Sequence, residues 1–393
     1  MSTSKNKDGK TFENKLEIRF IDSFRFMQTS LAKLVDNLHR HSFKNLRRFY
    51  KGEKLDLLLR KGVFPYDWFK SFEKLNANKL PPKEAFHSKL YDSDISDEDH
   101  HHTEKVWENF EMKTFKEYHD AYLISDVLQL ADIFDNFRDV CMNNYELDPA
   151  WYYTAPGLAW DALLKKTKAE LELITDPDML LMIERGIRGG VSMFCTRYAK
   201  ANNKYMTVYD PNLPTTYIPY LDANNLYGWA MSQKLPFRGF EWMSEKQLSN
   251  WKKHPCILEV DLEFPHELHD LHNDYQLAPE SPKVNKVEKL IPNLHNKTKY
   301  VVHHETLKFY QSHGLKITKV HRGVTFEESE WMKPYIELNT KLRAQAANNF
   351  EKEFFKLMNN SVFGKTMENI RNRVEVHLVT SEEEARKLLS KPN

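Results

Sequence analysis

Long apolar runs are missing from this chain of 393 residues, and their absence excludes two classes of protein. No run approaches the roughly 20 apolar residues that a membrane-spanning helix needs. The first ten residues, MSTSKNKDGK, lack the apolar stretch of a secretory signal. We therefore expect an intracellular protein that is neither secreted nor bound to a membrane.

The chain also has few cysteines and a low net charge. Cys141, Cys195 and Cys256 are far apart and match no zinc or redox spacing, which indicates ordinary thiols in a reducing compartment. The formal net charge is +1, so bulk electrostatics gives no reason to expect nucleic-acid binding. Internal repeats and low-complexity segments are lacking as well. None of these features identifies a function.

The residues that are present predict a multidomain chain of the α/β and α+β classes. Hydrophobic residues make up 41% of the sequence and aromatic residues 13%, enough for more than one core. Helical periodicity runs from about Glu104 to Tyr145, short strand-like runs fill Cys256 to Phe326, and helix returns after Glu328. This order predicts at least two domains.

Three other segments carry local predictions. The acidic tract DSDISDEDHHHTE (92–104) predicts a flexible surface loop, because its polar cluster breaks periodicity and three adjacent imidazoles cannot share one face. IRFIDS (18–23) and IRGGVSMF (187–194) carry strand signals, and Gly189 and Gly190 predict a sharp turn or a close backbone approach. TTYIPYLDANN (215–225) predicts a strand that leads into a turn after Asp222.

A helix from about Asn349 to Phe363 would place Lys352, Lys356 and Asn360 on one stripe at four-residue steps. The apolar side chains on its other side, which can anchor the helix to a core, are Phe350, Phe354, Leu357 and Met358. Two cations, an amide and the aromatic Phe363 on a rigid element suit a triphosphate. The competing interpretation is an ordinary solvated helix face.

Four short strings resemble motifs of one family. KLMNNSVFGK (356–365) resembles motif B of the family B DNA polymerases, and LDANNLYGWAM (221–231) resembles motif A. IRGGV (187–191) is similar to the Tyr-x-Gly-Gly element of the protein-primed members, and YLISD (122–126) fits their third exonuclease motif, Tyr-x3-Asp. Over nearly its whole length the chain resembles the viral, organellar and Maverick/Polinton transposon polymerases of this type.

The resemblance implies a DNA-directed DNA polymerase that adds dNTPs to a primer 3′ end with two Mg²⁺ ions. Asp222 would be a catalytic carboxylate and metal ligand, and Tyr227 the steric gate against a 2′-hydroxyl. The residues implied to contact the incoming nucleotide are Asn225, Leu226, Arg343, Lys352, Lys356, Asn360, Ser361, Phe363 and Gly364. Tyr122 and Asp126 would belong to a 3′–5′ exonuclease site, with Asp126 as a metal ligand.

The implied partners are a DNA template-primer, contacted by Gly189 and Gly190, and a terminal protein that serves as primer. A nuclear location is expected if a eukaryotic mobile element encodes the chain. The implied domains are the C-terminal part of an RNase H-like exonuclease (1–150), a junction with the Gly-Gly turn (151–215), a palm with motif A and an antiparallel sheet (216–260), a terminal-protein-region insertion (261–330), helical fingers with motif B (331–373) and the start of a return to the palm (374–393).

The sequence also departs from the family pattern. Gly228 stands where motif A usually has Pro, and Phe363 where many members have Tyr in motif B. The Tyr-x-Asp-Thr-Asp motif, which supplies the partner carboxylate, does not occur before Asn393, and no Asp-x-Glu exonuclease motif precedes Asp126. The resemblance therefore implies a middle slice of a longer polymerase.

Three interpretations of the whole chain remain open: an active polymerase, an incomplete fragment that binds DNA, nucleotide or terminal protein without turnover, and a chain completed in trans by a second one. For single residues the alternatives are structural. Asp222 could cap a turn, Tyr227 could be a half-buried core aromatic, and Asp126 could be solvated on a helix.

Overall fold

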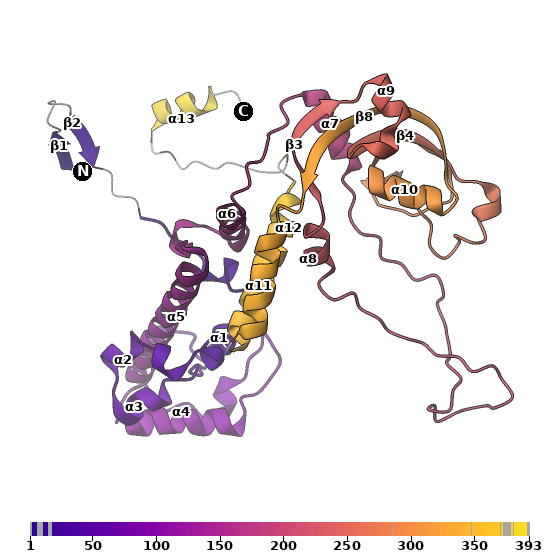
Figure 1. Ribbon diagram of the computed structural model, residues 1–393. Helices are drawn as coiled ribbons and strands as arrows, with labels where there is room; N and C mark the ends of the chain where they lie inside the picture. Colours follow the sequence, from indigo (N-terminus) through magenta and orange to yellow (C-terminus); the bar gives the residue numbers. More distant parts are fainter. Residues whose placement is uncertain are drawn as a thin grey trace. The chain divides into compact units, whose positions relative to one another are not determined.

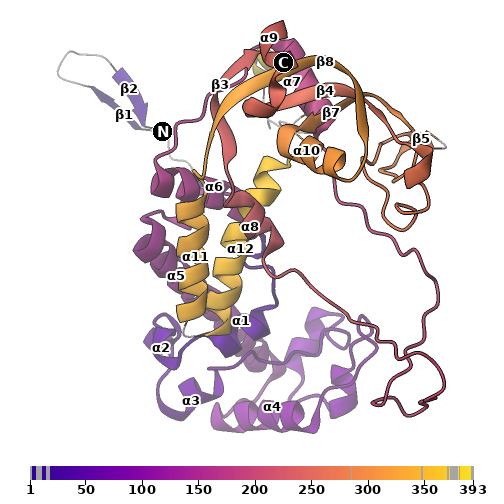
Figure 2. The same ribbon diagram turned by 45° about the vertical axis from the view of Figure 1, so that its right-hand side comes forward.

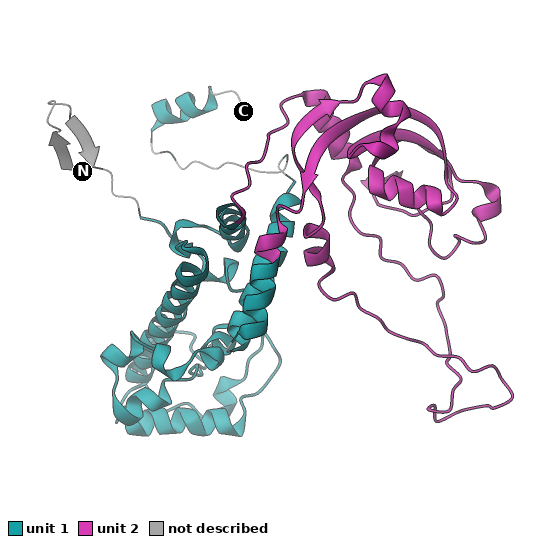
Figure 3. Cartoon of the chain, viewed as in Figure 1, with its two compact units in different colours: residues 1–166, 337–393 teal, residues 167–336 magenta. Residues whose placement is uncertain are grey.

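The computed structural model describes residues 18–283, 286–346, 348–369, 371, 379 and 381–390, and for 2–5, 11–14 and 284 the backbone alone. The chain divides into two compact units (Figure 3). Unit 1 is residues 1–166 and 337–393, and unit 2 is residues 167–336. Unit 2 is therefore one continuous insertion into unit 1.

Unit 1 is mainly helical (Figure 1). Its helices are α1 (Leu31–Asn37), α2 (Leu46–Phe49), α3 (Gly52–Leu57), α4 (Asp97–Asn109), α5 (Phe115–Tyr145), α6 (Ala155–Thr167), α12 (Asn349–Thr366) and α13 (Glu382–Leu389). Two short strands, β1 (Ser2–Lys5) and β2 (Thr11–Asn14), pair antiparallel. The helix α11 (Lys333–Gln345) begins in unit 2 and ends in unit 1.

The long helix α5 is the main scaffold of unit 1. Thr114 and Glu117 form a capping box at its start, which pairs two backbone N–H groups that the first turn leaves free. Its buried residues include Phe115, Ile133 and Phe137. The Phe137 ring meets the ring of Phe354 on α12 edge-on, with 5.1 Å between centroids. This contact fixes α12 against α5.

Unit 2 contains a four-stranded antiparallel sheet of order β3-β8-β4-β7 (Figure 2). Its elements are α7 (Pro177–Gly186), α8 (Leu226–Met231), β3 (Leu235–Trp242), α9 (Glu245–Ser249), β4 (Cys256–Glu263), β5 (Lys283–Val284), β6 (Val287–Glu288), β7 (Lys297–His303), α10 (His304–Ser312) and β8 (Lys316–Ser329). Short 3-10 helices in the two units lie at Ser23–Arg25, Arg40–Ser42, Phe72–Asn76, Lys83–Phe86, Pro149–Trp151, Trp251–Lys253 and His266–Leu268.

Both faces of this sheet are covered by helices. Met182 of α7 packs with Val301, whereas Leu307 of α10 packs with Val302. Because successive strand residues point to opposite faces, α7 and α10 lie on opposite sides of β7. Strand β4 lies inside the sheet, and its residues Cys256, Leu258, Val260 and Leu262 are buried.

Several predictions of elements are confirmed. The helical pattern of 104–145 forms α4 and α5, and the helix predicted from Asn349 forms α12. The strand-like runs between Cys256 and Phe326 form β4, β7 and β8 of an antiparallel sheet. The mixed α/β and α+β class follows from these two units.

The flexible loop predicted for the acidic tract 92–104 is wrong, because α4 begins at Asp97 and contains His100 to His102. The Ser96 side chain accepts the Asp99 backbone N–H at 3.0 Å, so the tract carries its own N-cap. Asp97, Glu98 and Asp99 then occupy the first turn, where negative charge stabilises the helix dipole. The acidic cluster is thus a helix start.

The strands predicted at 18–23, 187–194 and 215–222 are also wrong. Between 187 and 225 the only β pairing of the described backbone is the isolated bridge of Asn202 with Thr216. Tyr220 and Leu221 are 96% and 86% exposed, so the apolar alternation finds no partner strand here. Asp222 therefore does not end a strand.

The turn predicted at Gly189 and Gly190 is wrong too. Neither glycine has a positive φ, and nothing lies within 4 Å of a Cβ built on either one. A contact of these exposed glycines with DNA stays a prediction.

The predicted boundary between 260 and 261 cuts β4, so one sheet contains strands from both the predicted palm and the predicted insertion. Of the segment predicted to return to the palm (374–393), 374–378, 380 and 391–393 lie outside the described residues, as do 347, 370, 372 and 373 of the predicted fingers. Helix α13 lies in the rest of that segment, with Ser381 as its N-cap. No helix in the described residues is long and apolar enough to cross a membrane.

Candidate functional site

Helix α12 is oriented by a cap and by a buried stripe. The Asn348 side chain accepts the Glu351 backbone N–H at 2.9 Å and thus starts the helix. Phe354, Met358 and Val362 recur at four-residue steps and are at most 4% exposed. The face opposite this stripe is consequently held toward solvent.

That solvent face is the one predicted from the sequence. Lys352, Lys356, Asn360 and Gly364 follow one another at four-residue steps and are all exposed. The Lys356 Nζ lies 3.8 Å from a Glu353 carboxylate oxygen, a long contact between exposed groups that stabilises little. Nothing lies within 4 Å of a Cβ built on Gly364, so the surface beyond Asn360 is open.

The stripe borders a groove inside unit 1. The groove has a volume of about 450 Å³ and lies between α1 and α12. Lys33 and Asn37 of α1 line it together with Lys356 and Asn360 of α12, above apolar residues such as Leu34. The polar lining of this concave surface includes two cations, the carboxylate of Glu353 and four amides, those of Gln28, Asn37, Asn349 and Asn360.

The other residues predicted on the fingers helices have different surroundings. Arg343 is exposed near the end of α11, and Phe363 is half-buried on α12. Ser361 is only 6% exposed and lies on the buried side of α12, away from Lys356. Its predicted contact with a base pair stays a prediction.

The sequence did not predict a role for Asn359, the first asparagine of the NNS string. Asn359 is 5% exposed, and its side-chain oxygen accepts a hydrogen bond from the Asn339 amide at 2.8 Å. The Asn339 oxygen in turn accepts the Tyr145 hydroxyl at 2.6 Å. These three side chains link α12, α11 and α5, and no local pattern predicts a link across such sequence distances.

The motif A segment lies in unit 2 and is described there by itself. Asp222 is exposed and precedes α8 without regular structure. Asn225 has a left-handed backbone with φ of 54° and stands at the N-cap of α8. Leu226 and Tyr227, the first residues of α8, are 54% and 53% exposed. Asp222 and Tyr227 are both accessible to a ligand.

Gly228 is buried and packs under the Asn225 side chain. A Cβ built on Gly228 would lie 2.4 Å from both the amide nitrogen and the oxygen of Asn225. This close approach gives a physical reason for glycine at the position where motif A usually has Pro.

The predicted exonuclease pair lies in a polar cluster on α5. The Lys61 Nζ lies 2.7 Å from Asp126 Oδ1 and 2.8 Å from Oδ2, and it also contacts the Tyr122 hydroxyl. The Tyr66 hydroxyl lies 2.6 Å from that of Tyr122. The structure therefore brings Tyr122 and Asp126 together, and it adds Lys61 and Tyr66.

Burial shapes the chemistry of this cluster. Desolvation lowers the pKa of Lys61, although Asp126 opposes that shift. Desolvation also raises the pKa of Tyr122, and the Tyr66 hydroxyl adds to this rise. The only sequence signal for Lys61 is a lone cation before the apolar run of GVFP, which periodicity does not distinguish from a solvated lysine.

Among the described residues, the predicted carboxylate ligands do not lie where potential metal ligands converge. Neither Asp222 nor Asp126 belongs to a described group of three His, Cys, Asp or Glu side chains whose ligand atoms converge. The one such group in the described part of the chain is His303, His304 and Glu328 in unit 2.

Comparison with known proteins gives the family context. A family model described as DNA polymerase type B, organellar and viral, matches residues 2–391. No curated protein matches the chain.

Among solved structures, the chain is similar to phi29 DNA polymerase in an orthorhombic crystal form, with 14% identity, a TM-score of 0.40 and coverage of 79% of this chain and 48% of that one. It is also similar to phi29 DNA polymerase complexed with primer-template DNA and incoming nucleotide substrates, with 15% identity, a TM-score of 0.42 and coverage of 80% and 50%. The chain thus spans about half the length of the solved relatives that it matches.

Proposed function

Because the chain belongs to the organellar and viral type B DNA polymerases, we propose that it acts in DNA replication as a DNA-directed DNA polymerase. It adds deoxynucleotides to the 3′ end of a primer on a DNA template, and a terminal protein serves as the first primer. The observation that carries this proposal is the family match, which runs through both units.

The exposed stripe of α12 supports a role in nucleotide binding. Lys352 and Lys356 are like charges one turn apart, which repel each other unless an anion lies between them. A triphosphate provides that anion, and its oxygens accept charge-assisted hydrogen bonds from both ammonium groups. Asn360 and the open surface at Gly364 leave room for the base pair that follows.

Asp222 and Tyr227 form the second part of the proposal. Asp222 contributes one carboxylate to a Mg²⁺ site, since Mg²⁺ prefers oxygen ligands. The described residues do not fit a complete two-metal centre, because Asp222 is in no described group of three converging ligands. The role assigned to Asp222 is therefore to hold metal, and the role of Tyr227 is to exclude a 2′-hydroxyl by contact with the sugar.

The cluster around Asp126 supports an exonuclease-like site. The Lys61 cation neutralises the Asp126 carboxylate, so a metal ion at Asp126 must displace or share this partner. Desolvation lowers the pKa of Lys61, which weakens its hold on the proton relative to a solvated lysine. We assign to Tyr122 the orientation of the bound phosphodiester.

A second candidate function is binding without turnover. The observation that favours it is the exposed position of Asp222 outside any described group of converging ligands. In that case the chain binds template-primer or nucleotide, and Asp222 has no catalytic effect.

Primer extension distinguishes the two candidates. We expect Asp222→Asn to abolish extension and to leave the affinity for primer-template DNA unchanged in a fluorescence-anisotropy titration. We expect Lys356→Ala to raise the KM for dNTP by roughly 10- to 100-fold, the cost of one charge-assisted hydrogen bond. Lys341→Ala, an exposed lysine on α11, is the matched control and should leave KM unchanged.

Each result has a definite meaning. Extension by the Asp222→Asn variant at the rate of the unsubstituted chain would contradict the assignment of Asp222. DNA binding by the unsubstituted chain with no extension in any divalent cation would favour binding without turnover.

A further inference from the structure

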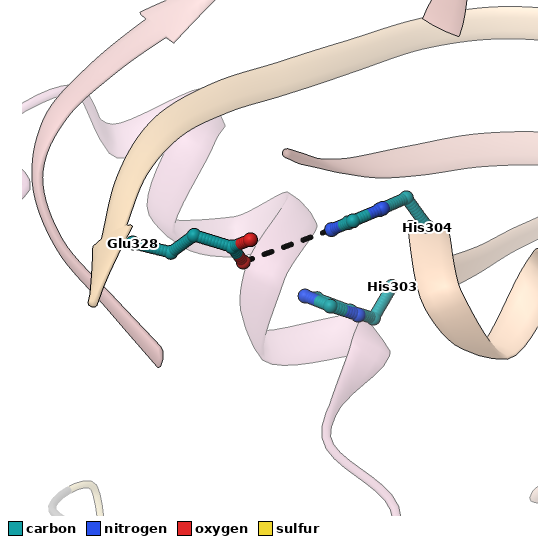
Figure 4. Close-up of side chains that lie close together, drawn as sticks. All are labelled: His303, His304 and Glu328. Carbon is teal, nitrogen blue, oxygen red and sulfur yellow. Dashed lines mark ion pairs between the residues drawn. The ribbon is translucent and has the colours of Figure 1, made fainter. Parts of the chain in front are cut away.

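Two histidines and a glutamate converge at one end of the sheet in unit 2 (Figure 4). His303 ends β7, His304 begins α10, and Glu328 lies near the end of β8. Each side chain offers one ligand atom, and these atoms lie within 4.8 Å of one another. Both rings extend toward the Glu328 carboxylate in Figure 4.

At this end of the sheet, β4 does not extend between β7 and β8. Cys256, the first residue of β4, pairs with Thr325, so Glu328 lies beyond the beginning of β4. The Glu328 backbone pairs instead with Pro236 of β3 on the other side. No backbone of β4 therefore separates Glu328 from the two imidazoles.

His304 is buried and has no hydrogen bond to satisfy it. The residue is 4% exposed, and neither Nδ1 nor Nε2 makes a hydrogen bond. Its Nε2 faces a Glu328 carboxylate oxygen at 3.7 Å. A neutral imidazole lone pair and a carboxylate oxygen are both acceptors, so this arrangement is unfavourable unless a proton or a cation lies between them.

The Glu305 carboxylate favours the His304 tautomer that carries its proton on Nδ1, which leaves Nε2 available to bind a metal ion. Glu305 Oε1 lies 3.2 Å from His304 Nδ1, near enough to accept its proton after a small rotation. Metal-bound histidines usually donate their second ring N–H to such a carboxylate. With Nδ1 protonated, Nε2 directs its lone pair toward Glu328.

The neighbours of His303 likewise orient its ring toward Glu328. Its ring stacks on Phe326, with 6.0 Å between centroids and 21° between planes. Its Nδ1 accepts the Glu305 backbone N–H at 3.3 Å, a long hydrogen bond that must be given up when an ion occupies Nε2 and the ring proton moves to Nδ1.

We propose that His303, His304 and Glu328 bind a divalent transition-metal ion of the Zn²⁺ class. Two imidazoles and one carboxylate form a donor set typical of Zn²⁺, with a fourth position for water. Mg²⁺ requires oxygen ligands and octahedral geometry, so it does not fit this set. Ligand distances of about 2.0–2.2 Å require the three side chains to close by roughly 1 Å.

The local charge also favours a cation. Glu305 and Glu328 carry two negative charges, and Lys308, which pairs with Glu305 at 2.7 Å, carries one positive charge. The bound ion ties the junction of β7 and α10 to the end of β8. The site uses different residues from the Mg²⁺ site assigned to Asp222.

The test is titration of the full chain, freed of metal by a chelator, with Zn²⁺ in an isothermal calorimeter. We expect one tight equivalent that excess Mg²⁺ does not displace, and a melting temperature raised by about 5 °C or more at 100-fold excess over Kd. His304→Gln and Glu328→Gln should each weaken this equivalent by at least about 100-fold. His313→Ala, an exposed histidine just after α10, is the matched control and should bind as tightly as the unsubstituted chain.

Two results would overturn the proposal. One is a chain that takes up no Zn²⁺ beyond the Glu328→Gln variant, and the other is tight binding that both variants retain. If His304→Gln does not fold, Glu328→Gln decides alone, because it keeps the shape of a side chain that is 17% exposed. Neither result depends on primer extension, so the polymerase proposal is tested separately.

Discussion

Asp132 lies in the middle of α5 and is 1% exposed, yet it carries a carboxylate. Its two oxygens accept the backbone N–H groups of Asn45 at 2.6 Å and Leu46 at 3.0 Å. These donors begin α2 and have no partner within that helix. One buried side chain of α5 thus sets the start of a helix some 90 residues earlier in the chain.

We predict that Asp132→Ala lowers the free energy of unfolding by about 3 kcal/mol, because two buried donors lose a charged acceptor. Urea denaturation followed by circular dichroism measures this change. Asp139→Ala is the matched control on the same helix: its carboxylate is 61% exposed and pairs with Lys44, so the loss should stay within about 0.5 kcal/mol. Equal losses in the two variants would contradict the role of Asp132.

Asp148 gives a pH-dependent prediction. Arg138 donates two hydrogen bonds to its carboxylate, at 3.0 and 2.7 Å, and holds the pKa of Asp148 below its ordinary value of 3.8. A lowered pKa adds stability above pH 3.8, and this stability is lost as the pH falls through the folded-state value. Because Arg138 is 44% exposed, screening limits the contribution to about 1 kcal/mol.

Asp148→Asn should therefore lower the free energy of unfolding near pH 7 by about that amount, and the difference from the unsubstituted chain should shrink in strong acid. Chemical denaturation at several pH values measures it. A difference that stays constant from neutral to acid pH would mean that the Arg138 pair contributes through geometry rather than charge.

Single residues also show what the sequence could predict. The exposed stripe of Lys352, Lys356 and Asn360 follows from helical periodicity, which is local information. The partner of Asp126, Lys61, lies 65 residues away in the chain, and no periodic pattern connects the two. Local spacing therefore predicted one half of the candidate site, while the other half depends on tertiary packing.

Among elements, α5, α11 and α12 are joined by the hydrogen bonds of Tyr145, Asn339 and Asn359. Asn339 is fully buried, and both of its hydrogen bonds are made to other buried side chains. We predict that Asn339→Leu lowers the free energy of unfolding by about 2–4 kcal/mol, since it removes two buried hydrogen bonds. Thermal unfolding by calorimetry measures the loss.

The control for this network is the double variant Tyr145→Phe with Asn339→Leu. If the two side chains stabilise the protein through their shared hydrogen bond, the double variant should lose less stability than the sum of the two single losses. Additive losses in the double variant would show that the two side chains act independently.

Elements also show where propensity failed. The strands β4, β7 and β8 were predicted from short strand-like runs, and each of them pairs with at least one neighbour in the sheet. The stretch 215–222 has a similar apolar character, yet its backbone finds no neighbouring strand, and strand propensity depends on that context. The prediction for the acidic start of α4 was wrong in the opposite sense, because residues that cap a helix were interpreted as a loop.

At the scale of the whole molecule, the segment 187–225 is the part of unit 2 most open to proteases. It lacks helix and strand over its described length up to α8, and Phe194, Tyr198 and Tyr220 are 74%, 78% and 96% exposed. Limited digestion with chymotrypsin should cut there first, and mass spectrometry should find two fragments that end in this segment. First cuts in α5 or β4 would contradict this prediction.

The family was predicted from four short motifs and is confirmed by the match over residues 2–391. The division into units was not predicted in this form. A sequence read from end to end favours consecutive domains, whereas unit 1 is closed by contacts between distant residues, such as Tyr145 with Asn339, which are 194 positions apart. Such contacts leave no local signature.

The insertion of unit 2 has a consequence for the order in which the chain matures on the ribosome. The Tyr145 hydroxyl cannot donate to Asn339 until that residue, 194 positions further along, has been synthesised. At about 5–20 residues per second, translation of that stretch takes roughly 10 to 40 s. During this delay the face of α5 that later receives α12, with Phe137 at its centre, is uncovered in the nascent protein. Unit 2 is synthesised in that interval, so the part of unit 1 that is made first keeps this apolar face uncovered while unit 2 emerges.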